Sequence, residues 1–207
     1  MVHVGCSVDD ECLHLPMRAV RFPVELRAPA GFRADDLATW PKVDGRIEFV
    51  AGRIQYMPPC ADIQQEICID LGAVLSAWAR AHPGFVVGGN EAGMILAGDV
   101  RAADAAIWRR ADTGRAVGRL RRTPPVLAVE VAGQEEPEPE LREKARWYLE
   151  AGVEVVWIVL HDKREVVVLS RKGESRHGRS DRLPEAPSLP GLAPEVSAFF
   201  YQLDWSG

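Results

Sequence analysis

The chain has 207 residues, of which 47% are hydrophobic and 27% are charged, and its net charge is −5. This is a globular composition, and the length suits one domain with a sizeable core. The acidic balance excludes a protein that coats nucleic acid by bulk charge. Acidic residues at 9–11 interrupt the place of a signal peptide, and the longest apolar runs are too short to span a bilayer. We therefore expect a cytoplasmic protein that does not enter a membrane.

The first part of the chain lacks a clear periodic pattern. Residues 1–30 are punctuated by prolines, so we expect an irregular N-terminal arm, followed by a single domain over 31–207. Four potential zinc ligands lie in this arm: His3, Cys6, Cys12 and His14. Their spacing fits no standard zinc finger. In a reducing cytosol we expect free thiols, and the role of this cluster stays open.

The first half of the domain shows alternating helix and strand signals. Residues 62–82 carry apolar side chains at helical spacing over five turns, which is the strongest periodic signal in the chain. The other elements expected here are a helical turn at 35–40, a hairpin of 47–50 with 53–57, strands near 85–89, 93–97 and 103–108, and a basic loop over 109–124.

The second half contains the most apolar strand signals. Residues 126–131 are nearly all apolar, which is typical of a central strand that is covered on both faces. The elements that follow are a helix over 138–151, a second buried strand over 153–160, a pairing strand over 164–170 and an apolar segment near 196–200. This order predicts an α/β fold with a central sheet.

Carboxylates at the ends of strands indicate where chemistry would occur. Glu130 closes the buried strand, and burying a carboxylate is costly unless it meets a cation or hydrogen-bond donors. Asp104 lies on another short strand, and two such carboxylates offer the hard oxygen ligands that divalent metals prefer. Glu48 points to the opposite hairpin face from its apolar neighbours, so it could supply a third oxygen.

A lysine completes this candidate site. On a helical wheel Lys144 lies about 60° from Leu141 and about 40° from Tyr148, at the margin of the buried face. From there its ammonium could reach over the sheet edge toward a metal. It could orient or help to deprotonate a water, or stabilise the charge of a phosphorane-like transition state.

Each of these residues also has a structural interpretation. Glu48 could be an exposed hairpin residue, and Asp104 could cap a turn. Lys144 could pair with Glu140 four residues earlier, a helix-surface contact worth only about 0.3–0.5 kcal/mol.

Taken together, the motifs resemble the Uma-type endonuclease family within the PD-(D/E)XK superfamily, from about Asp35 to Phe200. Lys144 stands fourteen residues after Glu130, as the helix lysine of that family does. The other matching motifs are Glu48–Gly52, Pro58-Pro59, Ala103-Asp104, Glu130-Val131, Tyr148–Val153, Val156–Val159 and Leu189–Leu192.

The resemblance implies a restriction-endonuclease-like core, a central mixed sheet flanked by helices, and Mg²⁺-dependent hydrolysis of DNA, with Mn²⁺ as a substitute. The metal would be held by Asp104, Glu130 and the Val131 carbonyl, and Glu48 would assist or bind a second metal. Lys144 would replace the lysine that the superfamily carries two residues after its glutamate, where this chain has Ala132. Gln64 and Glu140 would support the site. By analogy with nucleases that cut both strands, we also expect a homodimer.

The chain departs from the family pattern around these residues. An acidic run of Glu135, Glu136, Glu138 and Glu140 follows the strand glutamate and would repel phosphate unless a metal neutralises it. Three hypotheses follow: a metal-dependent DNA endonuclease, a weakened relative that binds nucleic acid or a protein without cutting, and a structural domain that retains the carboxylates.

Overall fold

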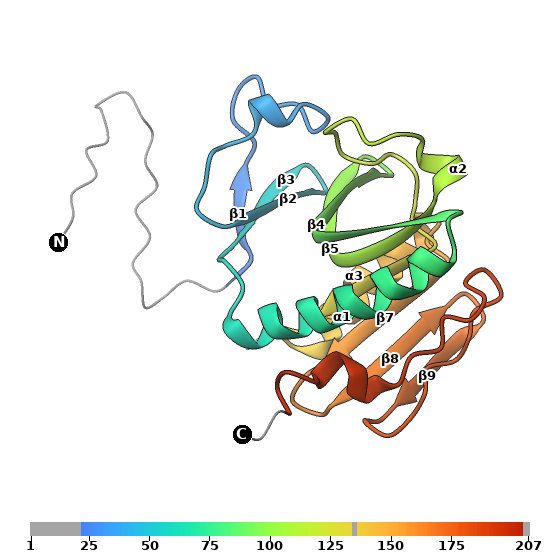
Figure 1. Cartoon of the computed structure of the whole chain (residues 1–207). Helices are drawn as coiled ribbons and strands as arrows, with labels where there is room; N and C mark the ends of the chain where they lie inside the picture. The colour runs from blue at the N-terminus through green and yellow to red at the C-terminus, as the bar shows by residue number, and fades with distance from the viewer. Residues whose placement is uncertain (1–21, 134–135, 205–207) are drawn as a thin grey trace.

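The computed structural model describes residues 22–133 and 136–204 as a nine-stranded mixed sheet with helices on both faces (Figure 1). The strand order is β1-β3-β2-β5-β6-β7-β8-β9. Strand β4 lies outside this order and pairs with β5. The pairing of β6 with β7 is parallel, and the chain passes through α3 between them. This confirms the expected α/β fold with a mixed sheet flanked by helices.

The elements have the following bounds. The strands are β1 (Val24–Arg27), β2 (Arg46–Val50), β3 (Arg53–Met57), β4 (Phe85–Leu96), β5 (Asp99–Arg109), β6 (Leu127–Val131), β7 (Val155–Leu160), β8 (Glu165–Ser170) and β9 (Gly173–His177). The helices are α1 (Asp62–Ala81), α2 (Arg110–Thr113) and α3 (Glu138–Glu150), with 3₁₀ turns η1 (Leu37–Thr39) and η2 (Val196–Phe200).

The elements with the strongest local signals form as expected. The β2–β3 hairpin turns at Ala51 and Gly52, whose φ angles of 49° and 79° are those of a primed turn that matches strand twist. Helix α1 spans the predicted stripe, and Gly152 follows α3 with φ 103°, a conformation that favours glycine.

Four segments differ from the sequence expectation. Residues 24–27, expected in an irregular arm, form β1 at the edge of the sheet beside β3. The two strands expected near 85–97 are one strand, β4, whose register shifts where Asn90 and Glu91 adopt positive φ. A bulge of this kind interrupts the alternation of side chains between the two faces of a strand, and the pattern therefore predicts two separate strands. Strand β9 and the short helix α2 were not expected. The cluster His3, Cys6, Cys12 and His14 lies outside the described residues.

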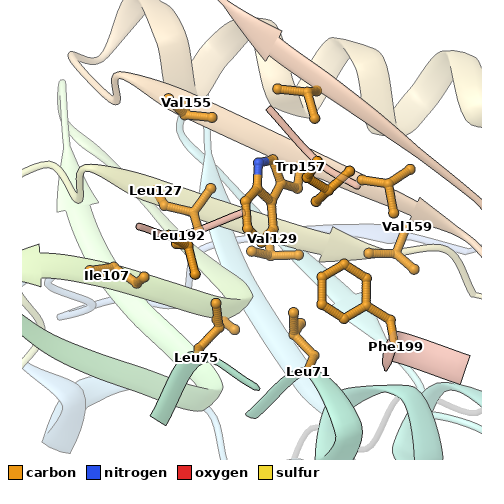
Figure 2. Close-up of a cluster of buried hydrophobic side chains, with 14 of the residues drawn as sticks. Leu71, Leu75, Ile107, Leu127, Val129, Val155, Trp157, Val159, Leu192 and Phe199 are labelled. Carbon is orange, nitrogen blue, oxygen red and sulfur yellow. The ribbon is translucent and has the colours of Figure 1, made fainter. Parts of the chain in front are cut away.

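Two apolar cores lie on opposite faces of the sheet. On one face α1 and η2 pack on the strands, and Figure 2 shows Leu71 and Leu75 directed at Val129, with Trp157 beside Phe199. On the other face α3 packs on the sheet through residues such as Leu141 and Ala145. Since neighbouring residues of a strand face opposite sides, Leu127, Val129 and Val131 of β6 join the first core, whereas Glu130 meets α3. Within the described residues no helix has both the length and the apolar character needed to cross a bilayer.

The first turn of α3 is anchored by a cluster of charges. The carboxylate of Glu138 accepts hydrogen bonds from Arg142 of α3, Lys163 of the β7–β8 turn and Arg176 of β9. Partial burial opposes ionisation of Glu138, but these three cations outweigh it and lower the pKa of Glu138 from 4.5 to about 2. The cluster therefore ties the helix that carries Lys144 to the far edge of the sheet.

This anchor predicts a pH-dependent stability. Glu138→Gln should lower the free energy of unfolding by about 1 kcal/mol at pH 7, a modest value because the cluster is partly exposed. The folded pKa is depressed, so the contribution of Glu138 is complete above the unfolded pKa and is lost as the pH falls toward 2. In urea unfolding, the difference in free energy of unfolding between the wild type and Glu138→Gln should become smaller from pH 7 to pH 3. Glu150→Gln, at the exposed last residue of α3, is the control; a gap for Glu138→Gln that stays constant with pH would contradict the cluster's role.

Candidate active site

The structure brings together the four residues singled out from the sequence, each on a different element. Glu48 lies on β2, Asp104 on β5, Glu130 on β6 and Lys144 on α3. The Nζ atom of Lys144 is 2.9 Å from Oε2 of Glu130 and 3.1 Å from Oε1 of Glu48. It also donates to the carbonyl oxygen of Ala102 at 2.9 Å. An ammonium has three N–H donors, so these three acceptors can use all of them. Lys144 thus pairs with the glutamates of β2 and β6 and not with Glu140 of its own helix.

Glu130 is buried, with 4% of its surface exposed. Both of its carboxylate oxygens accept hydrogen bonds from α3, because the Tyr148 hydroxyl donates to Oε1 at 2.7 Å and Lys144 donates to Oε2. Burial raises the pKa of Glu130 to about 8; Lys144 opposes this rise, and the nearby carboxylates of Asp104 and Glu48 add to it. One ammonium among several buried carboxylates is too little positive charge to keep all of them ionised easily.

Glu48 is also buried, at 4% exposure, so its interpretation as an exposed hairpin residue is wrong. Its Oε1 atom accepts a hydrogen bond from the backbone N–H of Ala102 at 3.0 Å. The guanidinium of Arg101 lies 3.8 Å from Oε2 of Glu48 and stacks over Trp147 at 4.9 Å. These contacts connect β2 to β5 and α3 on the same side of the sheet.

Asp104 bridges two neighbouring strands and does not cap a turn. Its Oδ2 atom accepts a 2.7 Å hydrogen bond from the backbone N–H of Val131, the residue after Glu130. Burial raises the pKa of Asp104, against the effects of this hydrogen bond and of the positive charges of Lys144 and Arg46. The nearest nitrogen of Arg46 is 4.0 Å from Oδ1.

The amide of Gln64, in the first turn of α1, occupies the point where three oxygens converge. Its Nε2 atom lies 3.0 Å from the carbonyl oxygen of Val131 and 3.4 Å from each carboxylate oxygen of Asp104. A side-chain amide nitrogen is a weak positive pole, so it marks a position that is favourable for a cation. The residue sits there because α1 begins at Asp62, shortly after the Pro58-Pro59 turn, and its first turn lies against the end of β6 and the middle of β5.

The donor set therefore fits a divalent cation by its chemistry. Asp104 and the Val131 carbonyl are hard oxygen ligands of the kind that Mg²⁺ takes. Glu130, the residue before Val131, adds a second carboxylate beside them. In the described part of the chain, however, no group of three or more His, Cys, Asp or Glu side chains stands close enough together to hold a metal ion. For Glu130 to join Asp104 as a ligand, one of its oxygens must exchange a protein donor, and Gln64 must yield its place.

The charge state of Lys144 decides between its two expected roles. Burial alone would lower the pKa of Lys144, but Glu130, Glu48 and Asp104 together raise it above its usual value. A lysine that stays protonated cannot take a proton from water. The arrangement therefore favours charge stabilisation by Lys144 over deprotonation.

Two contributors were not recognised as site residues from the sequence. Tyr148 was assigned only to the helix core, although it follows Lys144 by four residues and so shares its face of α3, a spacing that could have indicated its contact with Glu130. Arg101 gave no comparable signal. Glu140, expected to support the site, is exposed near the start of α3.

The shared ammonium can be tested with a double-mutant cycle. Lys144→Met leaves Glu48 and Glu130 buried together without their cation, and should lower the free energy of unfolding by about 3–5 kcal/mol. Adding Glu130→Gln removes one of the two stranded carboxyl groups, whose burial side by side is unfavourable in either charge state, so at least about 1 kcal/mol should return as coupling energy. The measurement is urea unfolding at pH 7. Lys163→Met, at an exposed partner of Glu138, should cost less than about 1 kcal/mol, and an additive cycle would argue against the pair.

Comparisons with known proteins bear on the fold and the family of the chain. A search of curated proteins finds no match. Among solved structures, the crystal structure of a "putative nuclease belonging to DUF820" from Anabaena variabilis superposes with a TM-score of 0.70 at 14% sequence identity, covering 80% of this chain and 96% of that one. This likeness shows that the fold is shared. The model of the Uma2 family, described as "Putative restriction endonuclease", matches residues 34–200. With most of its length matched in this way, the chain belongs to the Uma2 family.

Proposed function

We propose that this protein is a metal-dependent nuclease that hydrolyses phosphodiester bonds in DNA. The observation that carries the proposal is the convergence of three oxygens on one amide nitrogen. Both carboxylate oxygens of Asp104 and the Val131 carbonyl face Nε2 of Gln64, next to the Glu130–Lys144 pair. Oxygen ligands beside a protonated lysine are the groups that phosphoryl-transfer sites use to hold a cation and to offset developing negative charge.

In this proposal Asp104, Glu130 and the Val131 carbonyl hold the metal. A bound Mg²⁺ would polarise the phosphate and lower the pKa of an attacking water. Gln64, whose amide now contacts these oxygens, would have to move aside for the metal and would then support the ligands from α1. As a ligand, Glu130 would exchange one of its two hydrogen-bond donors for the metal. If that donor is Lys144, an N–H of the ammonium becomes free to stabilise the charge on the phosphate.

The remaining residues keep the ammonium in place. After such an exchange the Ala102 carbonyl would still accept from Lys144 and Glu48 would still pair with it, so the lysine would stay beside the reacting phosphate. Tyr148 retains the second oxygen of Glu130. Glu140 is exposed near the start of α3, so in this proposal it acts only at the outer edge of the site.

A second candidate function rests on a specific observation. Both oxygens of Glu130 already accept hydrogen bonds within the protein, and Lys144 donates to Glu130 and Ala102 and forms an ion pair with Glu48. If these contacts are too strong to exchange, the protein would bind nucleic acid or a protein partner without cutting. The homodimer and the cytoplasmic location stay predictions.

The first test combines calorimetry with cleavage. Mg²⁺ and Mn²⁺ should bind the purified protein and support cutting of plasmid DNA. Asp104→Asn should abolish metal binding, because it removes the carboxylate on which the oxygens converge. Lys144→Ala should leave metal binding measurable and lower the cleavage rate by about 10²–10³-fold, which is the usual effect of removing one charge-stabilising donor.

A neighbouring residue provides the matched control. Glu143→Gln changes an exposed carboxylate next to Lys144 on the same helix and should alter neither property. Cutting that survives in Asp104→Asn would reject the assigned site. Absence of metal binding together with saturable, salt-sensitive DNA binding would favour the second candidate.

A further inference from the structure

A pocket of about 630 Å³ lies next to the candidate active site, between the first turns of α1 and α3. Gln64 and Arg46 line its inner end, and both also contact Asp104, at 3.4 Å and 4.0 Å respectively. A ligand in this pocket would therefore continue directly from a phosphate placed at Asp104. The volume is within the range of about 300–1,000 Å³ that is usual for small-ligand pockets.

One wall of the pocket is apolar and partly exposed. It contains Phe22, Met57 and the Pro58-Pro59 turn. Phe22 leaves 47% of its surface exposed, although large aromatic side chains are mostly buried, and its ring is held edge-on by Tyr56 at 6.0 Å. A fixed aromatic face of this kind is a stacking surface for a planar ring, and stacking accepts any nucleobase.

A further part of the pocket lining is acidic. Glu136 and Glu140 line it and are both exposed, and the Glu136 carboxylate is held by a 3.2 Å hydrogen bond from the Gly133 N–H. Two carboxylates repel a phosphate but accept hydrogen bonds from amino groups on a base. A cationic side chain lies at the Asp104 end of the pocket. Arg46, 26% exposed, donates to Glu91 at 3.0 Å and stands 4.0 Å from Asp104, so its charge is shared by two carboxylates. In the proposed site a phosphate would lie at this end, and a base would lie toward Phe22.

We propose that this pocket takes an unpaired nucleobase, so that the substrate class is single-stranded or locally unpaired nucleic acid. The inference rests on the proposed function, because the base belongs to the nucleotide whose phosphate lies at Asp104. A base that stays paired and stacked inside a duplex cannot enter such a pocket, and enzymes that act on single bases take them out of the stack. The acidic part of the lining favours bases with an exocyclic amino group.

The test compares binding of short fluorescein-labelled strands by anisotropy, with Ca²⁺ present in place of Mg²⁺. Oligodeoxycytidine should bind about tenfold more tightly than an abasic strand of equal length, since base stacking is lost in the latter. Its affinity should also exceed that of a mixed-sequence duplex and that of oligodeoxyuridine, whose base carries a carbonyl oxygen in place of the amino group and an N–H at N3. Binding of oligoribocytidine at equal strength would support the pocket and extend the substrate class to RNA.

Variants separate the pocket from the rest of the site. Phe22→Ala should weaken the binding of oligodeoxycytidine about tenfold and leave the binding of the abasic strand unchanged. Phe22→Leu should have the same effect as Phe22→Ala, because the aromatic face is lost in both. Glu140→Gln should reduce the preference for cytosine over uracil. Tyr201→Ala removes an aromatic side chain that is 70% exposed outside the pocket, and should have no effect. Circular dichroism checks that each variant is folded.

The outcomes distinguish this inference from the proposed function. Equal affinity for strand and duplex, or an unchanged affinity in Phe22→Ala, would overturn the pocket assignment while leaving metal-dependent cleavage to its own test. Absence of binding to every nucleic acid would overturn both. Cleavage that fails while the strand preference depends on Phe22 would reject the nuclease and keep the pocket.

Discussion

The candidate site depends on one ammonium that is shared by two buried carboxylates. Lys144 contacts Glu130 at 2.9 Å and Glu48 at 3.1 Å, and both glutamates are almost fully buried. Burying charges is costly, and the cost is offset only when partners are close and the remaining hydrogen-bonding groups are satisfied. Here the Tyr148 hydroxyl and the backbone of Ala102 supply those bonds. The ammonium thereby joins β2, β5 and β6 to α3.

The same arrangement relates stability to function. A set of carboxylates that already holds a cationic side chain can fold as a closed network, but a metal has to compete with that side chain for Glu130. Asp104 is different, because its partners are a backbone N–H and a distant amide. In the proposed site Asp104 and the Val131 carbonyl would therefore be the ligands with the least competition from protein partners, and Glu130 would have to exchange a donor to join them. The free-energy cost of that exchange decides between a nuclease and a protein that binds without cutting.

The surroundings of the site divide the charges in space. Three of the acidic residues that follow β6 lie in the described part of the chain, and they have different surroundings. Glu138 turns to the cations of α3 and β9, whereas Glu136 and Glu140 line the neighbouring pocket. Glu136 adds to the negative charge at Asp104 and contributes to the raised pKa of that carboxyl, so part of the repulsion expected from the acidic run reaches the site. A phosphate at Asp104 would therefore need the charge of a bound cation to offset it.

Local patterns in the sequence determined the β2–β3 hairpin, α1, the buried strand β6 and α3, because these elements carry periodicity and turn signals within themselves. They also indicated Glu130, since a carboxylate in an apolar strand needs a partner. The family pattern added Asp104, Glu48 and Lys144. Only the tertiary structure decided that the amide of Gln64 faces Asp104, that Tyr148 donates to Glu130 and that Arg101 lies beside Glu48. Periodicity reports which side of an element is buried, but register and helix placement set which buried groups meet. For the same reason β1, the bulge in β4 and the edge strand β9, whose pairing depends on distant strands, could not be read from the sequence alone.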